Sequence, residues 1–369
     1  MFLSSQDVTD FLIERGLLSA KDVVAGEVTV LEAGRRCRNF KIMTGAGGGF
    51  FVKQVRSAAA DAIHTLNREA QLFTLIAGRD EFVALRRIVP KFRHYDPTRT
   101  ALVLDLVPGG ENVNELHWRL GRFPPEVGEL LGRGLGTYHA DTASLKAALE
   151  SGIFPAQKPW VLGLSPQSLS PLDQFGPGVG PEMIQMLRAR PLLLAHLAQL
   201  GQGYQFDALV HGDMKWDNFL IFPATPAGAH DFKAIDWELA DVGDAAWDIA
   251  AIFASYILYV VLSQNHVPPA GDAPREDRQL GAAKPAMRRF WEAYAETRGL
   301  TGQLAEFGGL RCMAYLSGRL VLSVFEGLIN ATLPMAQAEY LMGLAEQIAM
   351  QPQKAADDLM GPGALAWNG

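Results

Sequence analysis

One short segment, residues 209–222 (LVHGDMKWDNFLIF), carries side chains whose types and spacing could do chemistry. It has a carboxylate at Asp213 and, five residues later, an amide at Asn218. A carboxylate can accept the proton of an attacking hydroxyl, and an amide oxygen at this spacing can bind a metal ion next to a phosphate. Apolar triplets at both ends predict two short strands that hold the loop rigid. We therefore expect a catalytic loop for phosphoryl transfer, with Asp213 as the base.

Asp236 is a second acidic residue in a suitable setting, because it ends an apolar strand pattern that starts at Lys233. We expect this strand to deliver Asp236 to the same cleft as Asn218, where it would bridge Mg²⁺ to the β- and γ-phosphates of a nucleotide. Two protein oxygens, phosphate oxygens and water suit Mg²⁺, which keeps part of its hydration shell. Asn218 and Asp236 are therefore the predicted metal ligands.

Lys53 lies in another strand pattern, FFVKQV, and Glu69 follows sixteen residues later in a helical pattern. A lone strand lysine is usually a surface residue whose charged end reaches water. In kinase folds, however, a strand lysine paired with a helix glutamate orients the α- and β-phosphates. These two residues and the three above occur in the order that such folds use. The combination therefore predicts a nucleotide site with ATP as the phosphoryl donor.

The segment from Ala101 to Val107 (ALVLDLV) fits a strand and linker that join two lobes. Backbone groups in such a linker can form hydrogen bonds with adenine. We take Asp105 and Val107 as the predicted adenine contacts. ATP and Mg²⁺ are therefore the predicted cofactors.

The elements that would position these residues begin with a helical segment over residues 1–24. From Val28 the pattern changes to strand, turn, strand, glycine turn, strand, with the glycine turn at Gly45 to Gly49. A helix then follows over about 58–76, and a strand pair comes after it. Residues 25–107 are therefore predicted to form a nucleotide-binding N-lobe on an antiparallel sheet.

Residues 108–369 are predicted to form a mostly helical C-lobe. Helical spacing of apolar residues is clear over about 127–145 and 181–200. The C-lobe would also contain the catalytic loop at 209–222 and a metal motif at 233–248. The predicted fold class is therefore α+β, with two lobes.

Two segments of the predicted C-lobe lack a regular pattern. Residues 151–180 are dense in proline, glycine and serine, which predicts a long loop of functional importance. Residues 264–283 (QNHVPPAGDAPREDRQLGAA) are polar and predict an exposed excursion between helices.

The composition limits the classes of function. A chain of 369 residues exceeds the usual size of one hydrophobic core, which favours two lobes. The net charge of -7 makes nucleic acid a poor partner. The two cysteines, Cys37 and Cys312, form no disulfide pattern, which favours a cytoplasmic location. The most apolar run, Ile249 to Leu262, is about 14 residues long and too short to cross a bilayer, so we expect a core helix and no membrane partner.

The sequence resembles the aminoglycoside phosphotransferase and choline kinase family over about residues 25–345. The family's catalytic loop, HGD followed by four residues and Asn, is matched by His211 to Asn218. Its metal motif is matched by Asp236-Trp237-Glu238, by Gly243-Asp244 and by Asp248. The resemblance implies a two-lobed protein-kinase-like fold, a nucleoside triphosphate as donor and an acceptor with a hydroxyl. It also implies that His211 and Asp248 brace the loop and that His139 packs.

Two departures from the family pattern are informative. No GxGxxG motif is present, and a turn over residues 32–39 with three arginines takes its place, where Arg35, Arg36 or Arg38 could contact phosphate. Lys215, two residues after the base, stands where antibiotic kinases often have histidine, whereas protein kinases use a lysine there to contact the transferred phosphate. Lys215 is therefore a second predicted catalytic residue.

The acceptor has two alternatives that the sequence weights about evenly. A small-molecule alcohol is one, and a cationic one could be attracted by acidic residues of the metal motif, which are Glu238, Asp241, Asp244 and Asp248. For Asp244 and Asp248, however, a structural role is favoured over this attraction. Ser or Thr of a ribosomal precursor peptide is the other, because HGDMKWDN also resembles the stand-alone kinases of class V lanthipeptide and thioamitide pathways. Those kinases act with a separate partner lyase. An inactive pseudokinase is disfavoured because the polar site positions are intact.

Overall fold

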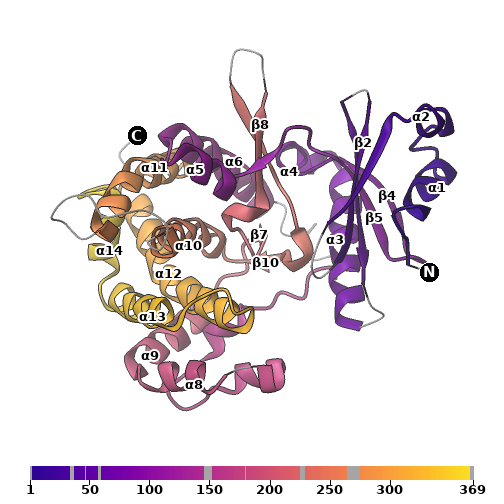
Figure 1. The fold of residues 1–369 in the computed structure, drawn as a ribbon. Coiled ribbons are helices and arrows are strands. Elements are labelled where there is room, and N and C mark those ends of the chain that lie inside the picture. Colours follow the sequence, from indigo (N-terminus) through magenta and orange to yellow (C-terminus); the bar gives the residue numbers. More distant parts are fainter. Residues whose placement is uncertain are drawn as a thin grey trace. The chain divides into compact units, whose positions relative to one another are not determined.

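A computed structural model describes residues 2–33, 37–45, 47–56, 60–144, 152–178, 180–224, 229–263 and 275–365. The chain divides into two compact units, which we call unit 1 (Met1–Val113 with Asp217–Ala240) and unit 2 (Asn114–Trp216 with Asp241–Gly369). Unit 1 contains an antiparallel sheet and unit 2 is mostly helical (Figure 1). The predicted α+β class is therefore confirmed. The lobe limits at 25–107 and 108–369 stay a prediction.

The main sheet of unit 1 has five strands in the order β1-β2-β3-β5-β4, and all neighbouring strands are antiparallel. The strands are β1 (Val28–Ala33), β2 (Cys37–Thr44), β3 (Gly49–Val55), β4 (Phe92–Asp96) and β5 (Ala101–Asp105). Strand β3 is central, and its Lys53 pairs with Asn39 on one side and Leu102 on the other. The sheet therefore holds Lys53 from both sides.

The turn between β2 and β3 depends on glycine. The Thr44 N–H donates to the Gly48 carbonyl at 3.0 Å. A Cβ at Gly49 would lie 1.9 Å from the Ile42 carbonyl oxygen, a distance that no side chain can take. The glycine-rich segment is therefore a hairpin turn, as predicted.

Two helices, not one, occupy the segment over residues 1–24. Helix α1 (Asp7–Glu14) and helix α2 (Ala20–Val24) are separated at Gly16, whose φ of 67° favours glycine. Phe11 of α1 is buried in the same apolar cluster as Phe40 of the sheet. The first helix therefore packs onto unit 1.

Helix α3 (Ala60–Gly78) lies beside the sheet, in contact with β3 and β4 (Figure 1). It confirms the helix predicted over 58–76. The short helix α4 (Val83–Ile88), which sequence patterns did not reveal, packs against strand β9 (His230–Ala234).

A second sheet in unit 1 has the order β6-β8-β9, with β6 (Glu111–Asn112) and β8 (Phe219–Pro223). Phe219 of β8 pairs with Ala234 of β9. Because these strands are antiparallel, the residue before β8 and the residues after β9 meet at one end of the sheet. That end holds Asn218 and Asp236.

Unit 2 consists mostly of helices, joined by a two-stranded sheet of β7 (Ala208–Val210) and β10 (Asp241–Gly243). The helices are α5 (Val113–Leu120, in unit 2 from Asn114), α6 (Pro125–Ser144), α8 (Pro181–Arg188), α9 (Pro191–Gln202), α10 (Ala245–Ser263), α11 (Arg275–Thr297), α12 (Gln303–Ile329), α13 (Met335–Met350) and α14 (Pro352–Met360). The helix predicted over 181–200 is broken in two because Pro191 starts a new helix. Helix α6 confirms the helix predicted over 127–145.

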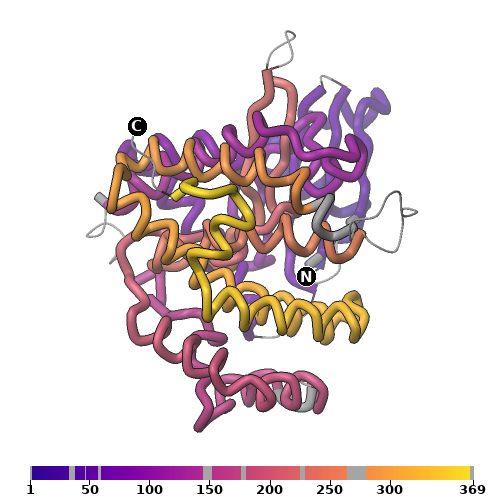
Figure 2. The backbone as a smooth tube through the Cα atoms, turned by 90° about the vertical axis from the view of Figure 1, so that its left-hand side faces the viewer, coloured from indigo at the N-terminus to yellow at the C-terminus, as the bar shows by residue number. Residues whose placement is uncertain are grey.

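Helices α6 and α11 lie side by side along their length (Figure 2). Glycines on α6 permit the close approach: a Cβ at Gly128 would lie 2.3 Å from the Ala286 carbonyl oxygen, and a Cβ at Gly132 would lie 2.3 Å from that of Phe290. A larger residue at either position would push the two backbones apart.

Two predictions for the irregular segments need correction. Residues 151–180 contain the 3-10 helices η2 (Trp160–Gly163) and η3 (Ser170–Gly178), and Trp160 packs against Phe175 and Phe325. In the predicted excursion over 264–283, residues from Arg275 onward belong to α11, and residues 264–274 lie outside the described residues. The helix forms because Ala283, Ala286 and Met287, at helical spacing, are fully buried.

The apolar run predicted to be about 14 residues long is part of α10, which has 19 residues. In the described part of the chain, α10 and α12 are long and apolar enough to cross a membrane by length and composition. However, 78% of the apolar window of α10 and 67% of that of α12 are buried inside the protein. Both have the burial of core helices, which is the role predicted for the apolar run.

Candidate active site

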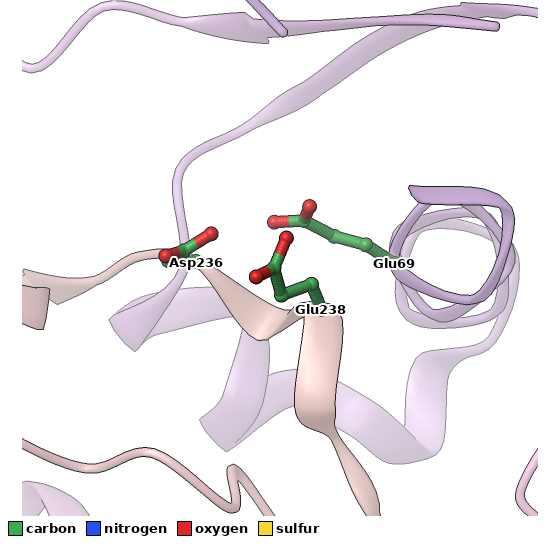
Figure 3. A group of neighbouring side chains, drawn as sticks. All are labelled: Glu69, Asp236 and Glu238. Carbon is green, nitrogen blue, oxygen red and sulfur yellow. The ribbon is translucent and has the colours of Figure 1, made fainter. Parts of the chain in front are cut away.

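The site residues of unit 1 meet around the ammonium of Lys53. Its Nζ lies 2.8 Å from Glu69 Oε2 and 3.2 Å from Glu238 Oε2, and it also donates to Asp236 Oδ1. The Lys53 side chain is 7% exposed. Figure 3 shows the carboxylates of Glu69, Asp236 and Glu238 turned toward one another, with Glu69 extending from α3. Sheet, helix and the segment after β9 thus each supply part of one charged cluster.

Trp237 anchors the segment that carries Asp236 and Glu238. Its indole is fully buried and donates to the Ala234 carbonyl at 2.9 Å, while its backbone N–H donates to Glu69 Oε1 at 3.1 Å. Asp236 has a φ of 67° and a ψ of 56°, in the left-handed region that costs a non-glycine residue free energy. Such backbone strain is concentrated at functional sites, where the surrounding contacts enforce it.

The electrostatics of this cluster are unbalanced. Burial lowers the pKa of Lys53, but Glu69, Asp236 and Glu238 outweigh it and raise that pKa well above its ordinary value. Burial also raises the pKa of Glu69, which the Lys53 ammonium opposes only in part. The two shifts therefore have different leading causes, which are the three carboxylates for Lys53 and burial for Glu69. The cluster therefore holds three carboxyl groups around one ammonium and would be stabilised by an additional cation.

Asn218 lies next to this cluster along the second sheet of unit 1. Its backbone carbonyl accepts a hydrogen bond from the Ile235 N–H at 2.9 Å, and Ile235 directly precedes Asp236. Asn218 ends the 3-10 helix η4 (Trp216–Asn218) and is buried. The structure thus brings Asn218 and Asp236 to neighbouring chain segments.

The other predicted nucleotide contacts are also in unit 1. The Asp105 N–H donates to the Lys91 carbonyl at 2.8 Å, and its carboxylate accepts from Arg93 Nη2 at 3.0 Å. The Val107 carbonyl accepts from the Gly110 N–H at 3.3 Å. The predicted contacts of Asp105 and Val107 with adenine stay a prediction.

Of the arginines in the turn over 32–39, Arg38 has partners within the protein. It donates to the Leu3 carbonyl at 2.7 Å and lies 3.6 Å from Glu32. Arg35 and Arg36 lie outside the described residues. Arg38 therefore has a structural role.

In unit 2 the catalytic loop is braced by Asp248, which is fully buried at the start of α10. Its carboxylate accepts from the N–H of His211 at 2.7 Å and from the N–H of Gly212 at 3.0 Å. The hydroxyl of Tyr138 donates to the same carboxylate at 2.7 Å. Burial raises the pKa of Asp248, but neighbours, foremost His139, lower it overall. Asp248 therefore stays ionised and acts as a structural brace, as the family resemblance implied.

The carboxylate of Asp213 lies between two cations. Lys215 Nζ is 2.6 Å from Asp213 Oδ2, and Arg319 Nη2 is 3.8 Å from Asp213 Oδ1. Burial raises the pKa of Asp213, but Lys215 and Arg319 outweigh it and lower the pKa overall. Asp213 is therefore ionised at neutral pH and can accept a proton. Burial lowers the pKa of Lys215, but Asp213 more than offsets it, so Lys215 stays charged.

Comparison with known proteins assigns the chain to a family. Residues 27–300 match the phosphotransferase enzyme family. The chain belongs to that family. It is therefore an enzyme that transfers a phosphoryl group to a hydroxyl acceptor. No curated protein matches the sequence of this phosphotransferase.

Solved structures similar to this phosphotransferase confirm its protein-kinase-like fold. A choline kinase from Cryptosporidium parvum has a TM-score of 0.58 at 11% identity, covering 96% of this chain and 97% of that one. An ethanolamine kinase from Plasmodium vivax has a TM-score of 0.54 at 12% identity, covering 93% and 86%. The macrolide 2'-phosphotransferase MphH from Brachybacterium faecium has a TM-score of 0.50 at 19% identity, covering 91% and 97%.

Acidic residues of the metal motif do not form a patch for a cationic acceptor, which corrects one hypothesis. The Asp241 carboxylate accepts from the Ala156 N–H at 2.8 Å. The Asp244 carboxylate accepts from Arg311 Nε at 2.8 Å, and Asp248 braces the catalytic loop. All three aspartates are buried, so their charges serve internal contacts.

Sequence patterns missed two residues of the site. The sequence places Glu238 in the metal motif and links it to a cationic acceptor, whereas the structure shows it in contact with Lys53, in the same cluster as Asp236. The spacing of Asp236-Trp237-Glu238 in the metal motif could have indicated this contact, because a single turn of 3-10 helix brings the two acidic side chains together. Arg319 had no signal, since it follows Asp213 by about a hundred residues in an apolar helix.

Proposed function

We propose that this phosphotransferase moves the γ-phosphoryl group of ATP, bound with Mg²⁺, to a hydroxyl acceptor. The observation that carries the proposal is the buried ammonium of Lys53, which Glu69 and Asp236 hold in one unit. A lysine so held has its donors fixed in place for nucleotide phosphates. Asp105 and Val107 would contact adenine through their backbone groups.

The residues around Lys53 fit a magnesium ion. Mg²⁺ prefers oxygen ligands, and Asn218 and Asp236 offer an amide oxygen and a carboxylate from neighbouring segments of unit 1. Glu69, Asp236 and Glu238 also place three carboxyl groups around the single ammonium of Lys53. When bound, Mg²⁺ would neutralise charge on the phosphates. Asn218 and Asp236 are the residues that we propose to hold it.

The remaining steps follow from the catalytic loop of unit 2. Asp213, ionised and held between two cations, would orient the acceptor hydroxyl and accept its proton. Lys215, whose side chain is 42% exposed, would neutralise charge on the transferred group. Little covalent chemistry is required, so positioning and electrostatics supply most of the rate.

We propose a small-molecule alcohol as the acceptor, because the similar structures include choline, ethanolamine and macrolide kinases. Ser or Thr of a ribosomal precursor peptide, with a partner lyase for the next step, is the second candidate. The contact between Lys215 and Asp213 favours it, because a lysine at this position is the protein-kinase pattern. The two cysteines support a cytoplasmic location for either reaction, since the described Cys312 is a free thiol.

The test is to incubate the protein with Mg²⁺ and ATP and with each candidate acceptor. The panel contains choline, ethanolamine, a macrolide, aminoglycosides and a Ser- and Thr-rich peptide. Phosphorylation adds about 80 Da, which mass spectrometry detects. A phosphorylated small molecule with unmodified peptide would exclude the peptide function, and the reverse result would exclude the small-molecule function.

Asp213→Ala separates chemistry from nucleotide binding. We expect turnover to fall by a factor of at least about 100, because the group that accepts the proton is lost. The affinity for ATP, measured by calorimetry, should stay nearly unchanged. A large loss of ATP affinity would contradict the role of Asp213 as a base.

A further inference from the structure

Arg319 of helix α12 reaches the catalytic loop of unit 2 from a distant part of the sequence. Its Nη1 donates to the Gly212 carbonyl at 2.9 Å, and its Nη2 lies 3.8 Å from Asp213 Oδ1. Its guanidinium also lies over the Trp247 ring, 4.9 Å from the ring centroid. The side chain is 6% exposed. A buried arginine with three such contacts has one stable orientation.

The peptide groups of Gly212 are held from both sides. Its N–H donates to Asp248 Oδ1 at 3.0 Å, and its carbonyl accepts from Arg319. Gly212 has a φ of 82°, which glycine adopts without strain. Trp247, beneath Arg319, is the neighbour of Asp248 in α10. An anion and a cation thus fix the backbone just before Asp213.

Lys215 and Arg319 contact different oxygens of Asp213. They also differ in how freely their charged ends can move. Lys215 is 42% exposed and ends a flexible stem, so its ammonium can exchange partners, and Glu326 also attracts it. Arg319 is buried and donates to the Gly212 carbonyl, which holds its guanidinium beside Asp213. His211 faces Asp213 as well, with its Nδ1 3.3 Å from the Asp213 N–H. Arg319 is thus the cation fixed next to the base.

We propose that Arg319 is a positioning residue that keeps the Asp213 carboxylate oriented and negatively charged while Lys215 moves between Asp213 and the transferred phosphoryl group. This inference rests on the proposed function, since it assigns a task to the residues that handle the proton and the phosphate. The lowered pKa of Asp213 supports it, because Arg319 is one of the two main cations that lower that pKa against the effect of burial.

The test measures the pKa of the Asp213 carboxyl directly, without nucleotide or acceptor. Protein labelled with ¹³C at the aspartate carboxyls is titrated by NMR, and Asp213→Asn identifies the signal. In Arg319→Met we expect that pKa to rise by about 1 unit, because a nearby cation is lost. In Arg319→Lys, which keeps a charge but not the forked donor, we expect a smaller rise. An Asp213 pKa that is the same in all three proteins would overturn the proposal.

Arg311→Met is a matched control on the same helix. Arg311 pairs with Asp244 through Nε at 2.8 Å, and it also donates to the Gly203 carbonyl and to Tyr315. None of these described partners belongs to the catalytic loop. We expect this variant to lose stability but to leave the pKa of Asp213 unchanged. An equal pKa rise in Arg311→Met and Arg319→Met would reduce Arg319 to a structural residue and would also overturn the proposal.

Kinetics give a second readout once an acceptor is known. Arg319→Met should lower kcat about 100-fold at pH 7, with the KM for ATP unchanged, because misplacing a catalytic group affects the chemical step. The acidic limb of the pH profile should move up by the same amount as the Asp213 pKa, and Arg319→Lys should recover part of kcat. If Arg319→Met does not fold, Arg319→Lys alone decides by its pKa. The NMR titration needs neither nucleotide nor acceptor, so it gives a result even if no acceptor is phosphorylated. Failure of this inference can therefore be told apart from failure of the proposed function.

Discussion

The ammonium of Lys53 is buried and lies in contact with three carboxylates. Glu69 belongs to helix α3, Asp236 is a predicted metal ligand, and Glu238 belongs to the same metal motif as Asp236. Removing one charge from a buried ion cluster leaves its partners without a counter-charge, which destabilises the folded protein strongly. Lys53 is therefore important for stability as well as for the proposed phosphate binding.

Lys53→Met should lower the free energy of unfolding by about 3 kcal/mol at neutral pH, because the buried Glu69 loses the cation that compensates it. The double variant Lys53→Met/Glu69→Gln should recover much of this loss, which urea unfolding can measure. The raised pKa of Lys53 predicts that its stabilisation is complete below its ordinary pKa of 10.5 and is lost as the pH rises through the folded value. A double variant as unstable as the single one would contradict this account.

At the scale of elements, two helices of unit 2 pack closely, and an aromatic cluster holds the end of the catalytic loop. The α6 and α11 backbones approach closely through glycines. The aromatic cluster surrounds His117 of α5, whose ring centroid lies 4.5 Å from that of Trp216 at the end of the loop. Tyr256 of α10 packs against the same Trp216 ring at 4.5 Å. Helices α5 and α10 therefore fix the position of Trp216.

Gly132→Ala should destabilise the protein by about 1–3 kcal/mol, because its Cβ would meet the Phe290 carbonyl oxygen of α11. Gly343→Ala on α13 is the matched control, since a Cβ there has nothing within 4 Å. The control should be stabilised by up to about 1 kcal/mol, since alanine favours helices. Thermal unfolding of the two variants and the wild type compares them, and equal effects in the same direction would refute the packing argument.

His117 predicts a dependence of stability on pH. Its Nδ1 donates to the Arg122 carbonyl at 3.1 Å, and its Nε2 has no partner among the described residues, so the neutral ring is favoured. Burial lowers its pKa from 6.5 to about 4. As the pH falls, the unfolded chain binds a proton at this histidine before the folded protein does. The stabilisation that the neutral His117 gives to the folded protein is therefore complete above pH 6.5 and is lost toward pH 4.

We expect the wild type to lose about 3 kcal/mol of stability from this group over that interval. His117→Phe keeps an aromatic ring but cannot titrate, so its stability should fall less steeply with decreasing pH. Urea unfolding at several pH values measures both slopes. Parallel slopes for the two proteins would show that His117 does not titrate as described.

At the scale of the whole molecule, the chain passes between the two units three times, after Val113, Trp216 and Ala240. The second passage lies inside the catalytic segment, so that Asp213 and Lys215 belong to unit 2 while Asn218 belongs to unit 1. Along the chain, four residues separate the proposed base, Asp213, from Asn218, which is one of the two proposed metal ligands.

Binding of ATP should raise the free energy of unfolding, and the rise should be larger with Mg²⁺ than without it. With Mg²⁺ and ATP at about 100 times the dissociation constant, we expect a gain of about 2.7 kcal/mol, seen as a higher Tm. ATP with a chelator in place of Mg²⁺ should give a smaller gain, because phosphate charge then meets the excess carboxylates around Lys53. Asp236→Asn should remove most of the difference between the two conditions. Equal gains with and without Mg²⁺ would contradict the proposed metal site.

The sequence by itself determined the elements and the order of the polar residues along them. Apolar alternation, the glycine turn and the spacing from His211 to Asn218 act over short distances, and each imposes a backbone geometry that is largely independent of the rest of the chain. The sheet strands, helix α3 and the family could therefore be predicted. A helix boundary that depends on one residue, such as Pro191, was not predicted because the apolar pattern continues across it.

The partners of the charged groups were decided by the tertiary structure. Whether an acidic residue meets a lysine, a backbone N–H or solvent depends on which elements pack against it. For this reason Glu238 joins Lys53 and Asp241 binds the Ala156 N–H. The clearest case is Arg319, which meets Asp213 only because helix α12 packs beside α10 and the catalytic loop. No local pattern carries that information, since it comes from the packing of segments far apart in the chain.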